Sequence, residues 1–230
     1  MDIFWRLILA HLLTDFTFQT NFIATWKRKS VIGILFHSSI FLVLSFLFTF
    51  TYLNQIWWRF KGWICIIIIF IIHFIEDYYR IWSIKNTGSG DNVFFFLWDQ
   101  FIHIFIIFLF MPVNQGFEYN KIVILLILFI LISHFASIFI YYIEESLYSS
   151  QPVHKRLEGK YITILTRLIL SATILIPRAW FIFVFPVITF ICYKYVLDNR
   201  FSFINKLLSF IFSLIVGFLA RYIIYGRIFI

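Results

Sequence analysis

Runs of about 20 apolar residues recur along almost the whole chain, and a helix of that length spans the hydrocarbon core of a bilayer. Eight such segments lie near residues 4–25, 31–53, 63–84, 93–113, 121–143, 161–176, 179–197 and 203–225. Pro177 separates two short segments that could instead form one hairpin without crossing fully. The sequence therefore predicts an all-α fold, a polytopic transmembrane helical bundle with six to eight spans.

Composition excludes the main alternatives to a membrane protein. The chain is 62% apolar and 13% charged, whereas soluble proteins are about 45–50% apolar and about 25% charged. The net charge of +8 comes without a nucleic-acid-binding motif, so we expect basic loops beside anionic lipid and no nucleic-acid partner. The abundance of Phe and Ile beside few Ala is typical of an AT-rich bacterial genome. We expect a multi-pass protein of the bacterial inner (cytoplasmic) membrane, whose partners are membrane lipids.

Two parts can be distinguished within one integral-membrane domain. Residues 1–113 contain four expected helices and nearly all of the intramembrane His and Asp residues. Residues 114–230 contain the further expected helices and a basic loop near 144–160. Nothing in the sequence indicates an oligomeric state.

Ionisable residues inside the expected spans are the most informative feature, because an Asp at the bilayer centre costs roughly 2.5–3.5 kcal/mol. Three His/Asp pairs have a spacing of four residues, which places both side chains on one helix face. Random placement of the same residues would give fewer than one such pair. The pairs and one further histidine are His11 and Asp15, His37, His73 and Asp77, and Asp99 and His103.

The depth of these residues is also consistent. Counted from the nearest odd-numbered loop, six of the seven lie roughly 10–18 Å below the same membrane face, and His11 lies one turn deeper. The helices alternate in direction, so this agreement does not follow from the spacing alone. We therefore expect the first four helices to bring the seven side chains to one layer.

Imidazole and carboxylate groups without thiolates suit one or two divalent metal ions, either zinc, manganese or iron. The alternative is a hydrogen-bond network that only ties the helices together. Gln19, Gln100 and Glu76 could orient ligands, and Glu76 is also the candidate general base. Arg167, in the sixth segment, could contact a phosphate or neutralise an excess Asp.

Several motifs resemble those of a bacterial integral-membrane family catalogued as domain of unknown function 3307. They are HLLTDFTFQT at 11–20, the lone His37, HFIEDYYR at 73–80 and WDQFIH at 98–103. GKYITILTRLIL from Gly159 and YKYVLDNRF from Tyr193 resemble its later segments more loosely, and Thr166 stands where an acidic residue is expected before Arg167. The resemblance implies a membrane protein without a settled activity. The His-x-x-x-Asp style is also similar to a second inner-membrane group, described as metal-dependent hydrolases.

These features predict an integral membrane protein with a buried His/Asp metal site, acting as a metal-dependent hydrolase on a lipid or lipid-linked phosphoester. The alternative is a non-enzymatic protein that uses the same polar cluster for ion or proton transport or for ligand sensing. Transporter sites often show internal repeats and broken helices, and no repeat is visible. A bis-histidine haem site is a third possibility, against which the three adjacent Asp residues argue.

Overall fold

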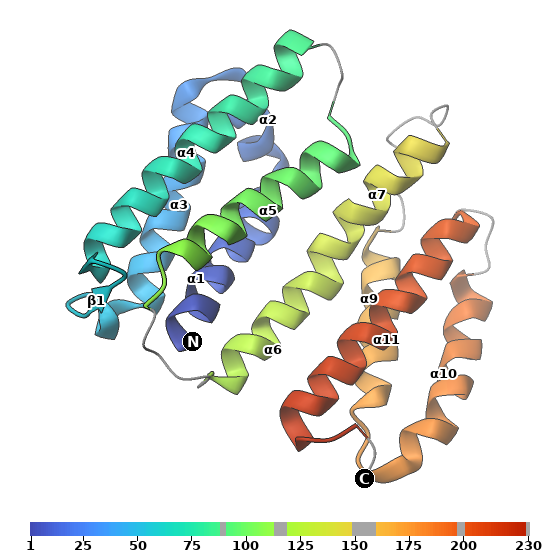
Figure 1. The fold of residues 1–230 in the computed structure, drawn as a ribbon. Helices are drawn as coiled ribbons and strands as arrows, with labels where there is room; N and C mark the ends of the chain where they lie inside the picture. Colours follow the sequence, from blue (N-terminus) through green and yellow to red (C-terminus); the bar gives the residue numbers. More distant parts are fainter. Residues whose placement is uncertain (88–90, 113–118, 149–159, 197–200, 229–230) are drawn as a thin grey trace. The chain divides into compact units, whose positions relative to one another are not determined.

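The computed structural model describes residues 1–87, 91–112, 119–148, 160–196 and 201–228, and these residues are almost entirely helical (Figure 1). The chain forms two compact units, Met1–Ile127 and Leu128–Ile230. The all-α prediction is confirmed, apart from one short hairpin in which Ile56 pairs with Lys61 and Trp57 with Phe60. The expected division after residue 113 and most of the basic loop near 144–160 lie outside the described residues.

The first unit is built on four helices that contact one another in a ring. Helix α1 contacts α3 and α5, and α4 also contacts α3 and α5, so the four enclose a common interior (Figure 1). The described elements of this unit, with α6 ending just beyond it, are α1 (Asp2–Leu12), π-helix η1 (Leu13–Phe18), α2 (Asn21–Lys29), α3 (Val31–Phe48), η2 (Phe50–Tyr52), β1 (Ile56–Trp57), β2 (Phe60–Lys61), α4 (Gly62–Thr87), α5 (Val93–Leu109) and α6 (Lys121–Ile130).

The first predicted span, 4–25, is wrong as one continuous helix. The helical segment that starts with α1 ends at Phe18, and Gln19 leaves helical geometry with φ −73° and ψ 77°. The Thr20 hydroxyl then accepts a hydrogen bond from the Ile23 N–H and caps the separate helix α2. Ser30 caps α3 in the same way, by accepting from the Gly33 N–H at 3.1 Å. Hydroxyl side chains at these two positions stop and restart the helix, because they replace the bonds that helix ends lack.

Gly33 allows α2 to lie directly against the start of α3. A Cβ atom at this position would lie 2.5 Å from the backbone carbonyl carbon and oxygen of Trp26 and 2.7 Å from the Lys27 nitrogen. Backbone atoms cannot swing away as a flexible side chain can. The absence of a side chain at Gly33 therefore fixes how closely α2, and Lys27 with it, approaches the bundle.

The second unit contains the remaining described helices. Helices α6 and α7 are joined through η3 into one continuous helix, Lys121–Leu147, whose larger part belongs to this unit. Helix α9 contacts α7, α10 and α11. The elements are η3 (Leu131–Phe135, a π-helix), α7 (Ala136–Leu147), α9 (Lys160–Ile174), η4 (Arg178–Trp180), α10 (Phe181–Val196) and α11 (Phe203–Tyr225).

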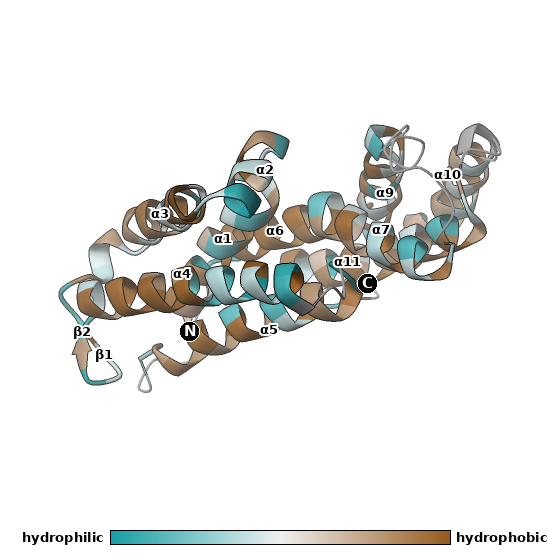
Figure 2. Cartoon of the chain, turned by 90° about the horizontal axis from the view of Figure 1, so that it is seen from above, coloured by the Kyte–Doolittle hydropathy of each residue, from teal (hydrophilic) through white to brown (hydrophobic). Residues whose placement is uncertain are grey.

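Three helices within the described residues are long and apolar enough to cross a bilayer: α3, the continuous helix Lys121–Leu147, and α11. Large apolar side chains cover the outside of the helices, whereas many polar side chains are buried. Figure 2 shows long apolar stretches on α3, α4 and α5, with polar residues on α2. This distribution indicates membrane association. Six to eight spans are not confirmed, because the helical segment from α1 through η1 ends at Phe18 and the apolar helices Val93–Leu109 and Phe181–Tyr193 have fewer than 18 residues.

Candidate metal centre

The interior of the four-helix ring holds all seven of the predicted metal ligands. They come from α1 and η1, α3, α4 and α5, and none is more than 6% exposed. We call this set the His/Asp cluster; it comprises His11, Asp15, His37, His73, Asp77, Asp99 and His103. The structure thus brings the seven side chains together, and their role as ligands stays a prediction.

One group of possible ligand atoms is formed by Asp15, His37 and His73. One atom from each of these residues lies within 4.8 Å of the others. His37 Nε2 is 3.2 Å from Asp15 Oδ1. Asp15 lies in the π-helical turn η1, and Asp15 Oδ1 is 3.9 Å from His11 Nδ1.

A second group is formed by Glu76, Asp77, Asp99 and His103, again within 4.8 Å of one another. His103 Nε2 lies 3.1 Å from Glu76 Oε2, 3.5 Å from Asp99 Oδ1 and 3.9 Å from Asp77 Oδ1. The rings of His73 and His103 stack with centroids 4.1 Å apart. His73, Asp77 and His103 form a third overlapping set, so the two groups are adjacent.

Several of these buried atoms have no aligned hydrogen bond within the described residues. They include both ring nitrogens of His37, the Nε2 atoms of His73 and His103, and carboxylate oxygens of Asp15 and Asp99. Buried polar atoms normally have a partner, and a group without one suggests an ion or water that supplies it. Lone pairs on imidazole and carboxylate are the ligands that zinc, manganese and iron accept. The cluster can therefore hold a metal ion.

Gln100 links three members of the cluster by hydrogen bonds. Its Oε1 lies 3.1 Å from His11 Nε2, and its Nε2 donates to Asp15 Oδ2 at 3.1 Å and to Asp99 Oδ2 at 3.0 Å. A side chain that holds two carboxylates and one imidazole fixes their directions, as residues behind metal ligands commonly do. Its role in orienting metal ligands stays a prediction.

Two cations that were not predicted to belong to the site contact carboxylates of the cluster. Lys27 Nζ is 2.6 Å from Asp77 Oδ1, with both side chains buried, and Arg80 NH1 donates to Asp99 Oδ2 at 3.0 Å. Burial disfavours the Lys27 ammonium ion, but the charges of Asp77, Asp15 and Asp99 outweigh it and raise the pKa of Lys27. Arg80 could have been found from its spacing, because it lies four residues after Glu76 and three after Asp77. Lys27 could be found only by locating the helix break at Gln19.

The net charge of the cluster favours the binding of a divalent cation. Four carboxylates, from Asp15, Glu76, Asp77 and Asp99, face the two fixed cations from Lys27 and Arg80. With all four carboxylates ionised and the imidazoles neutral, the carboxylates would outnumber the cations by two negative charges inside an apolar bundle. Buried charge without compensation is costly, and one divalent ion would balance it.

Arg167 lies in the second unit, and its guanidinium donates hydrogen bonds to residues of that unit. Its Nε donates to the Ile132 carbonyl at 2.8 Å and its NH2 to the Ser133 carbonyl at 3.1 Å, both in the π-helical turn η3. It also donates to the hydroxyls of Ser137 and Ser209. These bonds tie α9 to η3, α7 and α11, and its proposed contact with a phosphate stays untested.

Comparison with known families bears on the first unit. The family model described as "Protein of unknown function (DUF3307)" matches residues 3–124, more than half of the chain. The chain belongs to the DUF3307 family. The matched range contains the whole His/Asp cluster and not Arg167. No curated protein and no solved structure matches the chain, and the likeness of its motifs to metal-dependent hydrolases is not shown.

Proposed function

We propose that this DUF3307 protein binds a divalent metal ion in the His/Asp cluster and hydrolyses a lipid or lipid-linked phosphoester there. The observation that supports it most is the convergence of imidazole and carboxylate atoms without aligned hydrogen bonds, inside apolar helices. A network that served only to hold helices together would satisfy its own polar atoms. Zinc, manganese and iron all suit a donor set of this kind.

A divalent ion bound there would polarise a phosphoester oxygen and make a coordinated water more acidic. The residues of the chain would then handle the proton. Hydrolysis adds a water oxygen to phosphorus, breaks the bond to the alcohol oxygen, and moves one proton from water to the departing oxygen. Glu76 is at the edge of the cluster, 3.1 Å from His103 Nε2, and is partly exposed. It is placed to accept that proton and return it.

Metal content tests the first half of the proposal. Elemental analysis of purified protein in detergent should find at least one equivalent of Zn, Mn or Fe per chain, and His73→Ala should lose most of it. His134→Ala is the matched control, because His134 lies in the second unit and bonds to Ser133 instead of joining the cluster. Circular dichroism should show that both variants keep their helices. Metal-free wild-type protein, or equal metal in both variants, contradicts metal binding.

Lipid hydrolysis tests the second half. Metal-loaded protein is incubated with micelles of phosphatidic acid, phosphatidylglycerol or a lysophospholipid, and the products are identified by mass spectrometry. We expect turnover that a chelator stops and added metal restores. Glu76→Gln, loaded to the same metal content as the wild type, should slow it by about 10²–10⁴-fold, as loss of a general base does. If metal-replete protein turns over none of the three, the hydrolase proposal is wrong.

A non-enzymatic role is the second candidate, favoured by the pairing of Lys27 and Arg80 with carboxylates of the cluster. Fixed cations beside acidic groups are common in intramembrane proton and ion paths. Proteoliposomes loaded with a pH-sensitive dye would distinguish the two roles. Proton flux that Asp77→Asn abolishes, without lipid turnover, would support transport.

A further inference from the structure

A groove of about 800 Å³ runs between α4 and the first half of α5. Its α5 wall is apolar and includes Phe94, Leu97, Trp98 and Phe101. Its α4 wall includes the charged side chains of Glu76 and Arg80. The volume lies within the range of about 300–1,000 Å³ that is usual for ligand pockets. A ligand that fills it must be apolar on one side and polar on the other.

The charged wall of the groove is also the edge of the His/Asp cluster. Glu76 lines the groove and lies 3.1 Å from His103 Nε2. Arg80 lines the groove and donates to Asp99 Oδ2 at 3.0 Å. A polar group held against this wall would therefore lie beside the candidate metal ligands.

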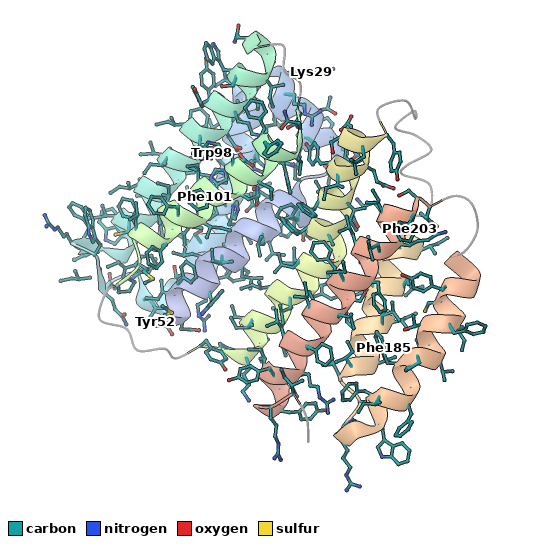
Figure 3. All side chains as sticks on the ribbon, turned by 45° about the vertical axis from the view of Figure 1, so that its right-hand side comes forward. Lys29, Tyr52, Trp98, Phe101, Phe185 and Phe203 are labelled. Carbon is teal, nitrogen blue, oxygen red and sulfur yellow. The ribbon has the colours of Figure 1, made fainter. Side chains whose placement is uncertain are left out.

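The apolar wall of the groove faces outward. Trp98 is 60% exposed and Phe101 58% exposed, and Figure 3 labels both on α5. Phe94, at the start of the same helix, is also largely exposed. Such a patch would be an aggregation hazard in water, but on a membrane helix it meets acyl chains. A molecule that already lies in the bilayer can reach the groove by lateral diffusion.

The charges favour an anionic head group on that ligand. Arg80 stands in the polar wall, and the Arg28 side chain approaches the same region through Asp91, which both arginines contact. The amino-terminal end of α5, capped by Asn92, also borders the groove, and a helix start attracts negative charge. With a divalent ion balancing the carboxylates of the cluster, a phosphate against this wall would meet the Arg80 guanidinium without an excess of negative charge behind it.

We propose that the α4–α5 groove binds an anionic membrane phospholipid, with one acyl chain along Trp98 and Phe101 and its phosphate beside Arg80 and Glu76. This inference rests on the proposed function, because the bound ion offsets the carboxylates that would otherwise repel a phosphate. The substrate would then reach the site from the bilayer and not from water.

Photolabelling in nanodiscs tests the groove directly. The metal-loaded chain is placed in phosphatidylcholine nanodiscs that contain phosphatidic acid with a diazirine on one acyl chain, and labelled peptides are mapped by mass spectrometry. We expect labelling to concentrate on residues 94–101 and on the facing part of α4. Diacylglycerol with the same diazirine chain serves as the neutral comparison and should label this region more weakly.

Two variants separate the groove from the rest of α5. The double variant Trp98→Ala/Phe101→Ala should lower labelling of the facing part of α4 about tenfold, because it removes two aromatic contacts from the chain-binding wall. Phe108→Ala is the control, because Phe108 is exposed on the same helix but does not line the groove. Both variants should keep their metal content, since neither alters a member of the cluster.

The outcomes distinguish this inference from the proposed function. Even labelling along all helices, or equal labelling by phosphatidic acid and diacylglycerol in metal-loaded protein, overturns the phospholipid site while metal binding stands. Cross-links that join two chains through α5 would overturn it in favour of a second copy. Groove labelling in protein that binds no metal would overturn the proposed function, and with it the role assigned to the ion in holding the phosphate.

Discussion

Replacing Lys27 by Met should destabilise the protein far more than replacing the neighbouring Arg28. The Lys27 ammonium lies 2.6 Å from Asp77 Oδ1, and the two side chains are only 8% and 1% exposed. Removing one partner of such a buried pair leaves the other charge without compensation, which typically costs about 3–5 kcal/mol. The Arg28–Asp91 pair is 3.3 Å apart with Arg28 67% exposed, so its loss should cost about 0–1 kcal/mol.

The free energy of unfolding can be measured by SDS titration of the purified protein in mixed micelles, followed by circular dichroism. A double-mutant cycle isolates the pair. Asp77→Asn in the Lys27→Met background should recover part of the loss, because it removes the uncompensated carboxylate. Lys27→Arg should retain part of the stability, since it keeps the positive charge.

Comparing the free energies of unfolding of Lys27→Met and Arg28→Met tests whether Lys27 compensates a buried carboxylate. If Lys27→Met costs no more than Arg28→Met, both before and after chelation of metal, Lys27 does not compensate a buried carboxylate. The charge balance argued for the cluster would then be wrong. A large cost only after chelation would mean that the bound ion compensates Asp77 as well.

Two further predictions follow from close contacts. Gly33→Ala should destabilise the protein by about 1–3 kcal/mol, because a Cβ 2.5 Å from the Trp26 carbonyl must push α2 away. In the Gly33→Ala background, Lys27→Met should then lower the free energy of unfolding by less than it does in the wild type. The same SDS titration measures both effects. Arg167→Met should lower stability by about 2–4 kcal/mol, because the carbonyls of Ile132 and Ser133 lose their donor. Its metal content should stay unchanged by elemental analysis, and loss of metal with the fold intact would place Arg167 in the site.

The apolar runs were sufficient to predict the helices, because hydrocarbon forces backbone groups to bond within each segment. Each predicted segment contains a described helix, although three of these helices qualify as membrane-crossing by length and hydropathy. The break at Gln19 is hard to see in the sequence because apolar residues continue on both sides of it, at Phe18 and at Phe22. Thr20, which caps α2, was the signal for it, and Ser30 and Gly33 mark the next junction, between α2 and α3.

The convergence of His and Asp could be predicted, because spacing fixes the helix face and depth fixes the layer. The cations could not be placed so easily. Lys27 lies beyond the predicted span 4–25, but the short helix α2 places it beside Asp77. Direction after a break depends on caps and close packing, neither of which hydropathy reports.

These inserted cations bear on how many metal ions the cluster can hold at rest. Lys27 and Arg80 already offset two of the four carboxylates, so one divalent ion brings the interior to neutrality. A second divalent ion would leave two positive charges in an apolar bundle, which is costly unless an anion accompanies it. A phosphoester arriving from the bilayer is such an anion. We therefore expect one ion in the resting protein, and a second only when an anionic ligand lies in the α4–α5 groove.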